Sequence, residues 1–287
     1  MTLKKQKIEG LTLDKERALY GLKRAEVRDC VFAGPADGES ALKECRNIAV
    51  RNCSFSLRYP MWHDIGFVLS DSTLDGRTRA PIWYSAKGTI ENTQISGVKC
   101  LRECREITLT GVKAVSPEFG WKCRGLKITD SEIESEYFLM GSEKIRISGL
   151  NMKGKYSFQY CKDVRIADSE LDTKDAFWHT KNVTVENTVI RGEYLGWYSD
   201  GLTLIGCRII GTQPLCYCRN LTLIDCEMED TDLSFEYSDV KASVKGNIVS
   251  VKNPRSGEIT ADSFGEILFT DDAVRECKAR VVTRNAN

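Results

Sequence analysis

The amino-acid sequence repeats with a period of nineteen residues. Seven residues, most of them small, stand nineteen apart with no insertion or deletion: Cys104, Cys123, Ser142, Cys161, Thr180, Ser199 and Cys218. The same phase continues towards the N-terminus, with slightly unequal steps, through Ser85, Asp64, Cys45 and Leu22. A repeat of this length is typical of a solenoid, in which each repeat forms one coil that stacks on the previous coil. We call the member of this series in each repeat position zero of that repeat.

Other residue types recur at fixed distances from position zero. Position +5 is aliphatic and position +10 is apolar in all eleven repeats, from Val27 and Phe32 in the first to Leu223 and Met228 in the last. Position +7 holds only Asn, Asp or Gly, which best tolerate a left-handed backbone conformation. Apolar and polar residues alternate between these points, as in Ile107-Thr108-Leu109-Thr110, which indicates β-strands.

These columns predict an all-β fold, because nineteen residues are too few for a coil that contains a helix and two turns. We expect a single-stranded right-handed parallel β-helix (solenoid) of about 12 coils with a 19-residue repeat. The chain is expected to form one domain. Its predicted parts are an N-terminal cap over residues 1–17, the parallel β-helix over 18–238, and final coils with a C-terminal cap over 239–287.

Charge and hydropathy narrow the choice of partners and compartment. The 287 residues include 41 basic and 41 acidic side chains, so the formal net charge is zero. This balance argues against a nucleic-acid surface, which needs a basic excess. The N-terminal residues lack the apolar stretch of a secretory signal, and no run is long enough to cross a membrane. We therefore predict a cytoplasmic protein without nucleic-acid or membrane partners.

Most of the twelve cysteines belong to two columns in which Ser and Thr are the common alternatives. They are Cys45, Cys104, Cys123, Cys161 and Cys218 at position zero, and Cys30, Cys53, Cys207 and Cys226 at position +8. Small, weakly polar residues in register predict stacked core residues.

A disulfide and a zinc site are the alternatives for these cysteines. However, adjacent coils hold Cβ atoms at ~4.8 Å, long for a disulfide. The spacing of Cys100, Cys104 and Cys123 matches no standard zinc motif. We predict no metal site and no cofactor.

Two adjacent columns before position zero collect the aromatic and histidine side chains. Position −2 contains all five tryptophans: Trp62, Trp83, Trp121, Trp178 and Trp197. Position −1 contains both histidines and several tyrosines: His63, Tyr84, Tyr160, His179, Tyr198 and Tyr217. The two columns share a strand, so one must face inward and the other outward. Charged residues interrupt both columns, so the sequence leaves open which one faces solvent.

The aromatic columns have two interpretations. They form either a packing ladder or a strip that binds sugars, because aromatic rings beside charged groups suit the apolar faces and hydroxyl edges of sugars. On the second interpretation, we predict a set of substrate-binding residues. They are Trp62, Trp83, Tyr84, Trp121, Trp178, His179, Trp197 and Tyr198.

Distances along the solenoid limit the catalytic combinations. His63 and His179 lie six coils apart, about 29 Å, so they cannot share a metal ion or form one dyad. Paired carboxylates for glycoside hydrolysis need roughly 5–9.5 Å between them. Two clusters are the catalytic candidates: Glu103 beside Arg102, and His63 beside Asp64. The alternative is that these are solvated surface charges.

The sequence also resembles known β-helix families. Coils such as Val50-Arg51-Asn52-Cys53 and Ile128-Thr129-Asp130-Ser131 resemble the pectate-lyase-like superfamily of right-handed β-helices. Segments including Asp175-Ala176-Phe177-Trp178 and Glu193-Tyr194-Leu195-Gly196-Trp197 resemble an uncharacterised bacterial family of predicted cytoplasmic β-helix proteins, a domain of unknown function. The resemblance implies the fold for roughly residues 5–270, and it makes sugar chemistry the default expectation. The paired Asp and Gly-His-Gly residues of the galacturonan hydrolases and the calcium-binding Asp cluster of the lyases are missing.

Two functional hypotheses follow. The first is a β-helix that binds or processes carbohydrate with its aromatic strip, taking a glycan or another small molecule as its ligand. If it is an enzyme, it resembles a polysaccharide or oligosaccharide hydrolase or lyase. The second is a non-enzymatic scaffold whose aromatic face contacts another protein or a second copy of the chain, forming a homo-oligomer.

Overall fold

A computed structural model describes residues 6–34 and 38–284. These residues form β-strands and turns without an α-helix, in a parallel β-solenoid of about 14 turns. The fold class predicted from the nineteen-residue repeat is thus confirmed, with slightly more coils than the 12 expected. Strands β1 (Gln6–Glu9) and β2 (Thr12–Leu13) lie within the residues expected to form an N-terminal cap.

The chain divides into two compact units, Met1–Arg146 and Ile147–Asn287, and each is described by itself. Strand β18 (Glu143–Lys155) contains the boundary. The other strands of the first unit are β3 (Ala25–Arg28), β4 (Val31–Ala33), β5 (Arg46–Arg51), β6 (Ser54–Ser56), β7 (Met61–Trp62), β8 (Ile65–Ser70), β9 (Thr73–Leu74), β10 (Ile82–Trp83), β11 (Ala86–Glu91), β12 (Gln94–Ile95), β13 (Arg105–Thr110), β14 (Lys113–Val115), β15 (Glu118–Phe119), β16 (Arg124–Ser135) and β17 (Tyr137–Phe138). Those of the second unit are β19 (Lys162–Ala167), β20 (Glu170–Lys174), β21 (Lys181–Glu186), β22 (Val189–Arg191), β23 (Asp200–Ile205), β24 (Arg208–Ile210), β25 (Leu221–Glu229), β26 (Asp239–Lys245), β27 (Asn247–Lys252), β28 (Ser256–Ala261), β29 (Ser263–Leu268) and β30 (Arg280–Thr283).

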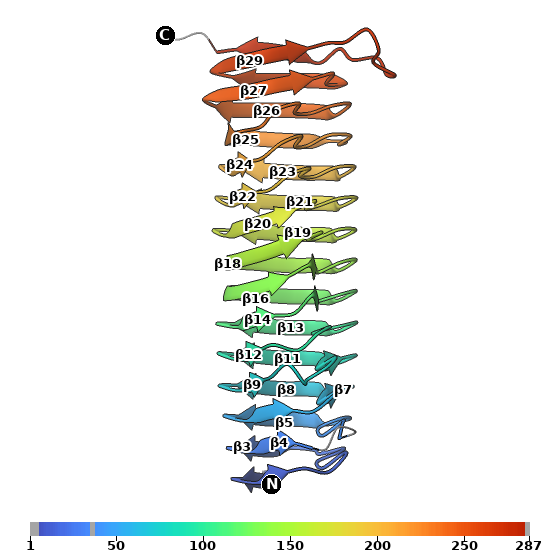
Figure 1. The fold of residues 1–287 in the computed structure, drawn as a ribbon, viewed down its shortest axis with the longest axis vertical. Helices are drawn as coiled ribbons and strands as arrows, with labels where there is room; N and C mark the ends of the chain where they lie inside the picture. Colours follow the sequence, from blue (N-terminus) through green and yellow to red (C-terminus); the bar gives the residue numbers. More distant parts are fainter. Residues whose placement is uncertain (1–5, 35–37, 285–287) are drawn as a thin grey trace, which may run out of the picture. The chain divides into compact units, whose positions relative to one another are not determined.

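Within each unit, successive coils pair through parallel strands, which Figure 1 shows as a ladder of arrows. In the first unit, Leu109 of β13 pairs with Ile90 of β11 and with Ile128 of β16. In the second unit, Leu204 of β23 pairs with Val185 of β21. The partners are nineteen residues apart in the sequence. The repeat therefore places like residues directly above one another.

The apolar columns form the core of each unit. Positions +5 and +10 are buried throughout, as Val27 and Phe32 illustrate at 0 % exposure. In the first unit, the rings of Phe32 and Phe55 stack with centroids 4.6 Å apart. In the second, Phe158 and Phe177 stack at 4.7 Å. These stacks follow from the pairing of equivalent positions in adjacent coils.

Left-handed residues mark the bends of each coil. Position +7 has a positive φ as predicted, for example 49° at Asn52 and 47° at Asp130. Position +2 also has a positive φ in all eleven repeats. Asn, Asp or Gly occupies it in seven of them, and Lys87 and Glu106 adopt φ 55° there as well. Side-chain identity therefore indicates both bends, the one at position +7 more uniformly than the one at position +2.

The cysteines occupy the core positions predicted for them, and eleven of the twelve are buried. Their thiols donate to backbone carbonyls of the preceding coil, as from Cys104 Sγ to Ile82 O at 3.4 Å. Ser142 makes the equivalent bond from its Oγ to Gly120 O at 2.6 Å, which explains why Ser and Cys exchange in this column. Burial raises the pKa of Cys45 to about 12 and that of Cys218 to about 11, so these thiols stay protonated at neutral pH.

Two negative findings apply to the described part of the chain. It contains no helix that is long and apolar enough to cross a membrane. Its His, Cys, Asp and Glu side chains form no group of three or more that could hold a metal ion.

Candidate ligand-binding site

Both aromatic columns lie on the outside of the coil, contrary to the expectation that one faces inward. The residues at position −1 have left-handed backbones, with φ 60° at His63 and 55° at His179. This conformation breaks the strand alternation, so positions −2 and −1 both point away from the core. The tryptophans are half-buried. At position −1 most rings are exposed, with Tyr198 at 45 %, but Tyr217 is half-buried and Tyr237 is buried at 9 %.

Each tryptophan is also a connector between coils. Its indole Nε1–H donates to a backbone carbonyl of the next coil, at 2.6–2.8 Å. The donor and acceptor residues are Trp62 and Ala80, Trp83 and Lys99, Trp121 and Tyr137, Trp178 and Tyr194, and Trp197 and Gln213. The tryptophan column therefore has a structural role whether or not a ligand contacts it.

We expect Trp121→Phe to lower the free energy of unfolding by about 1 kcal/mol, because it removes the bond to Tyr137 O at 2.8 Å but keeps an aromatic ring. Urea denaturation followed by circular dichroism measures this change. Tyr84→Phe is the matched control, because Tyr84 is exposed and its hydroxyl makes no hydrogen bond within the described structure, and it should be neutral. Equal effects of the two variants would contradict the connector role.

The predicted Arg102 cluster does come together in the first unit. The Arg102 guanidinium carbon lies 5.0 Å from the ring centroid of Trp83 and 5.2 Å from that of Trp121. The arginine thus fills the place of a ring in the tryptophan column through cation–π contacts. Glu103 is exposed beside it with a left-handed backbone, φ 52°. A catalytic role for Arg102 and Glu103 stays a prediction.

The predicted His63–Asp64 pair does not form. His63 is exposed and stacks on Tyr84 at 5.0 Å, whereas Asp64 is 0 % exposed and faces the core. Asp64 Oδ1 accepts the backbone N–H of Cys45 at 2.7 Å, and Oδ2 has no partner in the described structure. Burial raises the pKa of Asp64 well above its usual value. The reason is its place at position zero, where the other side chains are core serines, threonines and cysteines.

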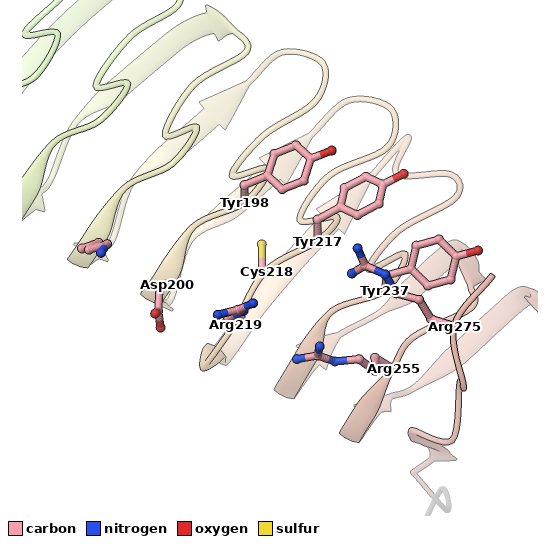
Figure 2. Close-up of a pocket in the computed structure, with 9 residues that line it drawn as sticks. Tyr198, Asp200, Tyr217, Cys218, Arg219, Tyr237, Arg255 and Arg275 are labelled. Atoms are coloured by element: carbon pink, nitrogen blue, oxygen red, sulfur yellow. The ribbon is translucent and has the colours of Figure 1, made fainter. Parts of the chain in front are cut away.

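In the second unit, five rings of position −1 form one continuous stack. The centroid distances are 5.1 Å for Tyr160–His179, 5.0 Å for His179–Tyr198, 4.8 Å for Tyr198–Tyr217 and 5.8 Å for Tyr217–Tyr237. The first three pairs are nearly parallel, within 14°. Ring faces therefore cover one another, and the stack offers solvent its edges and hydroxyl groups. Figure 2 shows the hydroxyls of Tyr198, Tyr217 and Tyr237 pointing away from the coil on the same side.

A pocket of about 300 Å³ lies beside the last three tyrosines of this stack. We call it the tyrosine pocket, and it is lined by Lys181, Tyr198, Asp200, Tyr217, Cys218, Arg219, Tyr237, Arg255 and Arg275. One wall is the tyrosine row at position −1. The opposite wall is position +1, and Figure 2 shows Asp200 and Arg219 along it. Between the two walls, position zero points into the core, as the buried Cys218 does.

Arg275 closes the pocket from outside the repeat. It belongs to the segment after β29, where the Val274 backbone N–H donates to the Tyr237 hydroxyl at 3.2 Å. The Arg275 guanidinium carbon lies 5.4 Å from the Tyr237 ring centroid and 6.0 Å from that of Tyr217. Cation–π contacts therefore hold this arginine at the end of the ring stack.

The Tyr217 hydroxyl is a hydrogen-bonding group at the tyrosine pocket. Its hydroxyl lies 3.4 Å from Glu236 Oε2, and Glu236 is also paired with Lys252. Burial, reinforced by the Glu236 carboxylate, raises the pKa of Tyr217 to about 12. The phenol therefore keeps its proton at neutral pH and donates it in a hydrogen bond to Glu236, which leaves its oxygen able to accept a hydrogen bond.

The sequence predicted only some of the residues of this site. Of the predicted substrate-binding residues, Tyr198 lines the pocket and His179 stacks on it. Trp178 and Trp197 lie in the neighbouring column, and the other predicted residues belong to the first unit. The cationic residues of the pocket were not predicted from the sequence, although two of them, Lys181 and Arg219, occupy position +1 of the repeat. Arg275 carries no repeat signal at all.

The stacked parallel coils, with an aromatic ladder and a pocket outside the core, define this chain as a parallel β-helix protein with a surface site. It belongs to the family described as "Protein of unknown function (DUF3737)", which matches residues 6–282. The resemblance to an uncharacterised β-helix family that the sequence indicated is confirmed. Comparison with curated proteins finds no significant match.

Solved structures of other proteins share the fold. A surface adhesin of Streptococcus pneumoniae, PfbA, is 9 % identical with a TM-score of 0.56, over 92 % of this chain and 86 % of that one. Tailspike protein 3 of bacteriophage CBA120 is 8 % identical with a TM-score of 0.52, over 96 % of this chain and 56 % of that one. The A-module of the Azotobacter vinelandii mannuronan C-5 epimerase AlgE6 is 12 % identical over 99 % and 91 %, but its TM-score of 0.41 carries no argument. At these identities the likeness shows the fold alone.

Proposed function

We propose that this protein is a carbohydrate-binding β-helix that holds a sugar in the tyrosine pocket. The observation that carries the proposal is the pocket itself: three tyrosines along one wall face charged side chains along the other. Small-molecule sites typically combine an apolar or aromatic wall with a few convergent polar groups. A sugar matches this arrangement, because its hydroxyls pair with phenols and charged groups while its C–H surface packs on ring edges.

The ring stack refines how a sugar would bind. Within the stack the ring faces are covered, so stacking of a sugar on a free face is available only where the stack ends. The Tyr217–Tyr237 step opens to 45° between ring planes, which loosens the stack at the pocket. A sugar is therefore expected to contact hydroxyls and ring edges there, and to leave the half-buried tryptophans as support.

Binding is favoured over glycoside hydrolysis at this pocket. Asp200 is the one carboxylate among its lining residues, and it accepts a hydrogen bond from Asn220 Nδ2 at 2.7 Å. Hydrolysis by the usual route needs two carboxyl groups roughly 5–9.5 Å apart on either side of the bond. The proposal therefore assigns recognition, and no catalytic step, to the pocket.

We expect a glycan array probed with the intact chain to identify at least one bound sugar, and Tyr217→Ala to weaken that binding by about tenfold or more. Isothermal titration calorimetry with the best sugar measures the change. Tyr84→Ala is the matched control, because Tyr84 has the equivalent place in the ladder of the first unit, and it should leave affinity unchanged. An array without a bound sugar would overturn the proposal, and so would equal losses in both variants.

A further inference from the structure

The tyrosine pocket is strongly cationic in a protein with no net charge. Its lining contains four cationic side chains, Lys181, Arg219, Arg255 and Arg275, against one carboxylate, Asp200, an excess of 4 − 1 = 3. The whole chain balances 41 basic and 41 acidic residues. The excess is therefore a local property of the pocket, and it raises the local concentration of anions.

Some cations of the same column are neutralised elsewhere in the coils. In the first unit, Arg124 at position +1 is paired with Glu143, the residue nineteen positions later. In the pocket, Arg219 lies between Asp200 and Asp239 in this column, but both carboxylates have other donors. Asn220 donates to Asp200, and Arg255 forms a two-pronged ion pair with Asp239.

Three cations of the pocket thus have no carboxylate partner among the described ion pairs: Lys181, Arg219 and Arg275. All three are exposed. Arg275 is held over Tyr237 and Tyr217 by ring contacts, which leave the edge of its guanidinium free to donate. A guanidinium in that position is suited to a planar or tetrahedral oxyanion.

We propose that the tyrosine pocket selects an acidic sugar, whose anionic group lies between Arg219 and Arg275 and whose ring lies against the accessible tyrosines of the lining, Tyr198 and Tyr217. This inference rests on the proposed sugar-binding function and narrows it to one ligand class. The cavity of about 300 Å³ is at the lower end of ligand-site volumes, so it suits a single charged unit of a chain or its terminus. The anion is a carboxylate or a sulfate ester, which share this chemistry.

The experiment compares three short oligosaccharides that have the same linkage and differ only in the group on C6: a hydroxymethyl, a carboxylate or a sulfate ester. Calorimetric titration of the full chain at low salt is expected to show one acidic member binding about tenfold or more tighter than the neutral one. Added salt should reduce this preference, because exposed charges are screened. Whichever acid binds best identifies the anion.

Variants test the assignment to these arginines. Arg219→Gln and Arg275→Gln should each weaken binding of the acidic sugar by about tenfold and leave the neutral sugar unchanged. Arg275→Lys keeps the charge and should lose less. Arg165→Gln is the matched control, because Arg165 is an exposed arginine of the same unit outside the pocket. Circular dichroism melting curves establish that each variant is folded.

Failure of the acidic-sugar inference can be distinguished from failure of the sugar-binding proposal. Equal affinity for neutral and acidic sugars would overturn this inference and leave the sugar-binding proposal standing. Binding of none of the sugars would overturn both. Free sulfate or acetate binding as tightly as the acidic sugars would show an anion site without sugar recognition, and so would overturn the inference. An equal loss in Arg165→Gln would remove the arginine assignment.

Discussion

Replacing Phe55 with alanine is expected to lower the free energy of unfolding by about 3–5 kcal/mol. Phe55 is 1 % exposed, and its ring stacks on Phe32 with centroids 4.6 Å apart and planes within 1°. On its other side, it pairs with Leu74 of the next coil. Alanine would leave a cavity that both neighbouring coils line, and stacked strands cannot close it without breaking their register.

Urea denaturation followed by circular dichroism measures this loss. Phe55→Leu is the matched control, because Leu74 already occupies the equivalent position one coil later, and it should cost about 1.5 kcal/mol or less. A double-mutant cycle with Phe32→Ala should give a coupling of about 0.5–1.5 kcal/mol for the ring pair. A loss below about 1 kcal/mol for Phe55→Ala would show that the stack is not part of a close-packed core.

Asp64→Ser is expected to raise the free energy of unfolding by about 1–3 kcal/mol at pH 7. Asp64 is fully buried, and its Oδ2 has no partner in the described structure. Serine recurs in this column, and Ser142 shows what it does there. Its Oγ accepts the Cys123 N–H at 2.8 Å and donates to Gly120 O at 2.6 Å. The substitution therefore removes a buried carboxyl group and supplies a paired hydroxyl.

The stabilisation should depend on pH, because burial raises the pKa of Asp64 in the folded protein. Below about pH 4 the carboxyl group is neutral in both states, and it costs no ionisation energy. As the pH rises above the unfolded value, the unfolded chain ionises while the folded carboxyl group stays neutral, so the wild type loses stability. The loss continues until the pH reaches the folded pKa.

Denaturation curves of wild type and Asp64→Ser at several pH values between about 3 and 8 test this sign. The difference between the two proteins should widen as the pH rises. Asp71→Ser is a suitable control, because Asp71 is exposed in the turn column and should show no such widening. A destabilised Asp64→Ser, or a difference that is constant with pH, would contradict the buried neutral carboxyl group.

The fold was predictable because the nineteen-residue repeat gives the length of each coil and also shows which columns of residues face the core. Like residues at positions +5 and +10 stack in the core, as Val185 and Leu204 do, and the Asn, Asp and Gly of position +7 bend the chain. The second bend, at position +2, was not predicted, although Asn, Asp or Gly occupies that position in seven of the eleven repeats; Lys87 adopts the same left-handed backbone there.

The candidate site was predictable only in outline. The columns of Trp, His and Tyr identified a chemically distinct edge of the coil, but strict alternation was the wrong rule for it. Left-handed residues such as His179 and Tyr198 turn two consecutive side chains to the outside. The scaffold and homo-oligomer alternative, like the cytoplasmic location, stays a prediction that awaits light scattering and fractionation.

The parallel β-helix, its coil length and the burial of its cysteines follow from the nineteen-residue repeat alone, because equivalent positions must stack. The tyrosine pocket does not follow from the repeat. Its tyrosines face out because of backbone conformations that side-chain type does not reveal. Its charge depends on which neighbours already engage Asp200 and Asp239, and Arg275 reaches it from a segment without repeat symmetry. Those are contacts between distant residues, and only the folded chain brings them together.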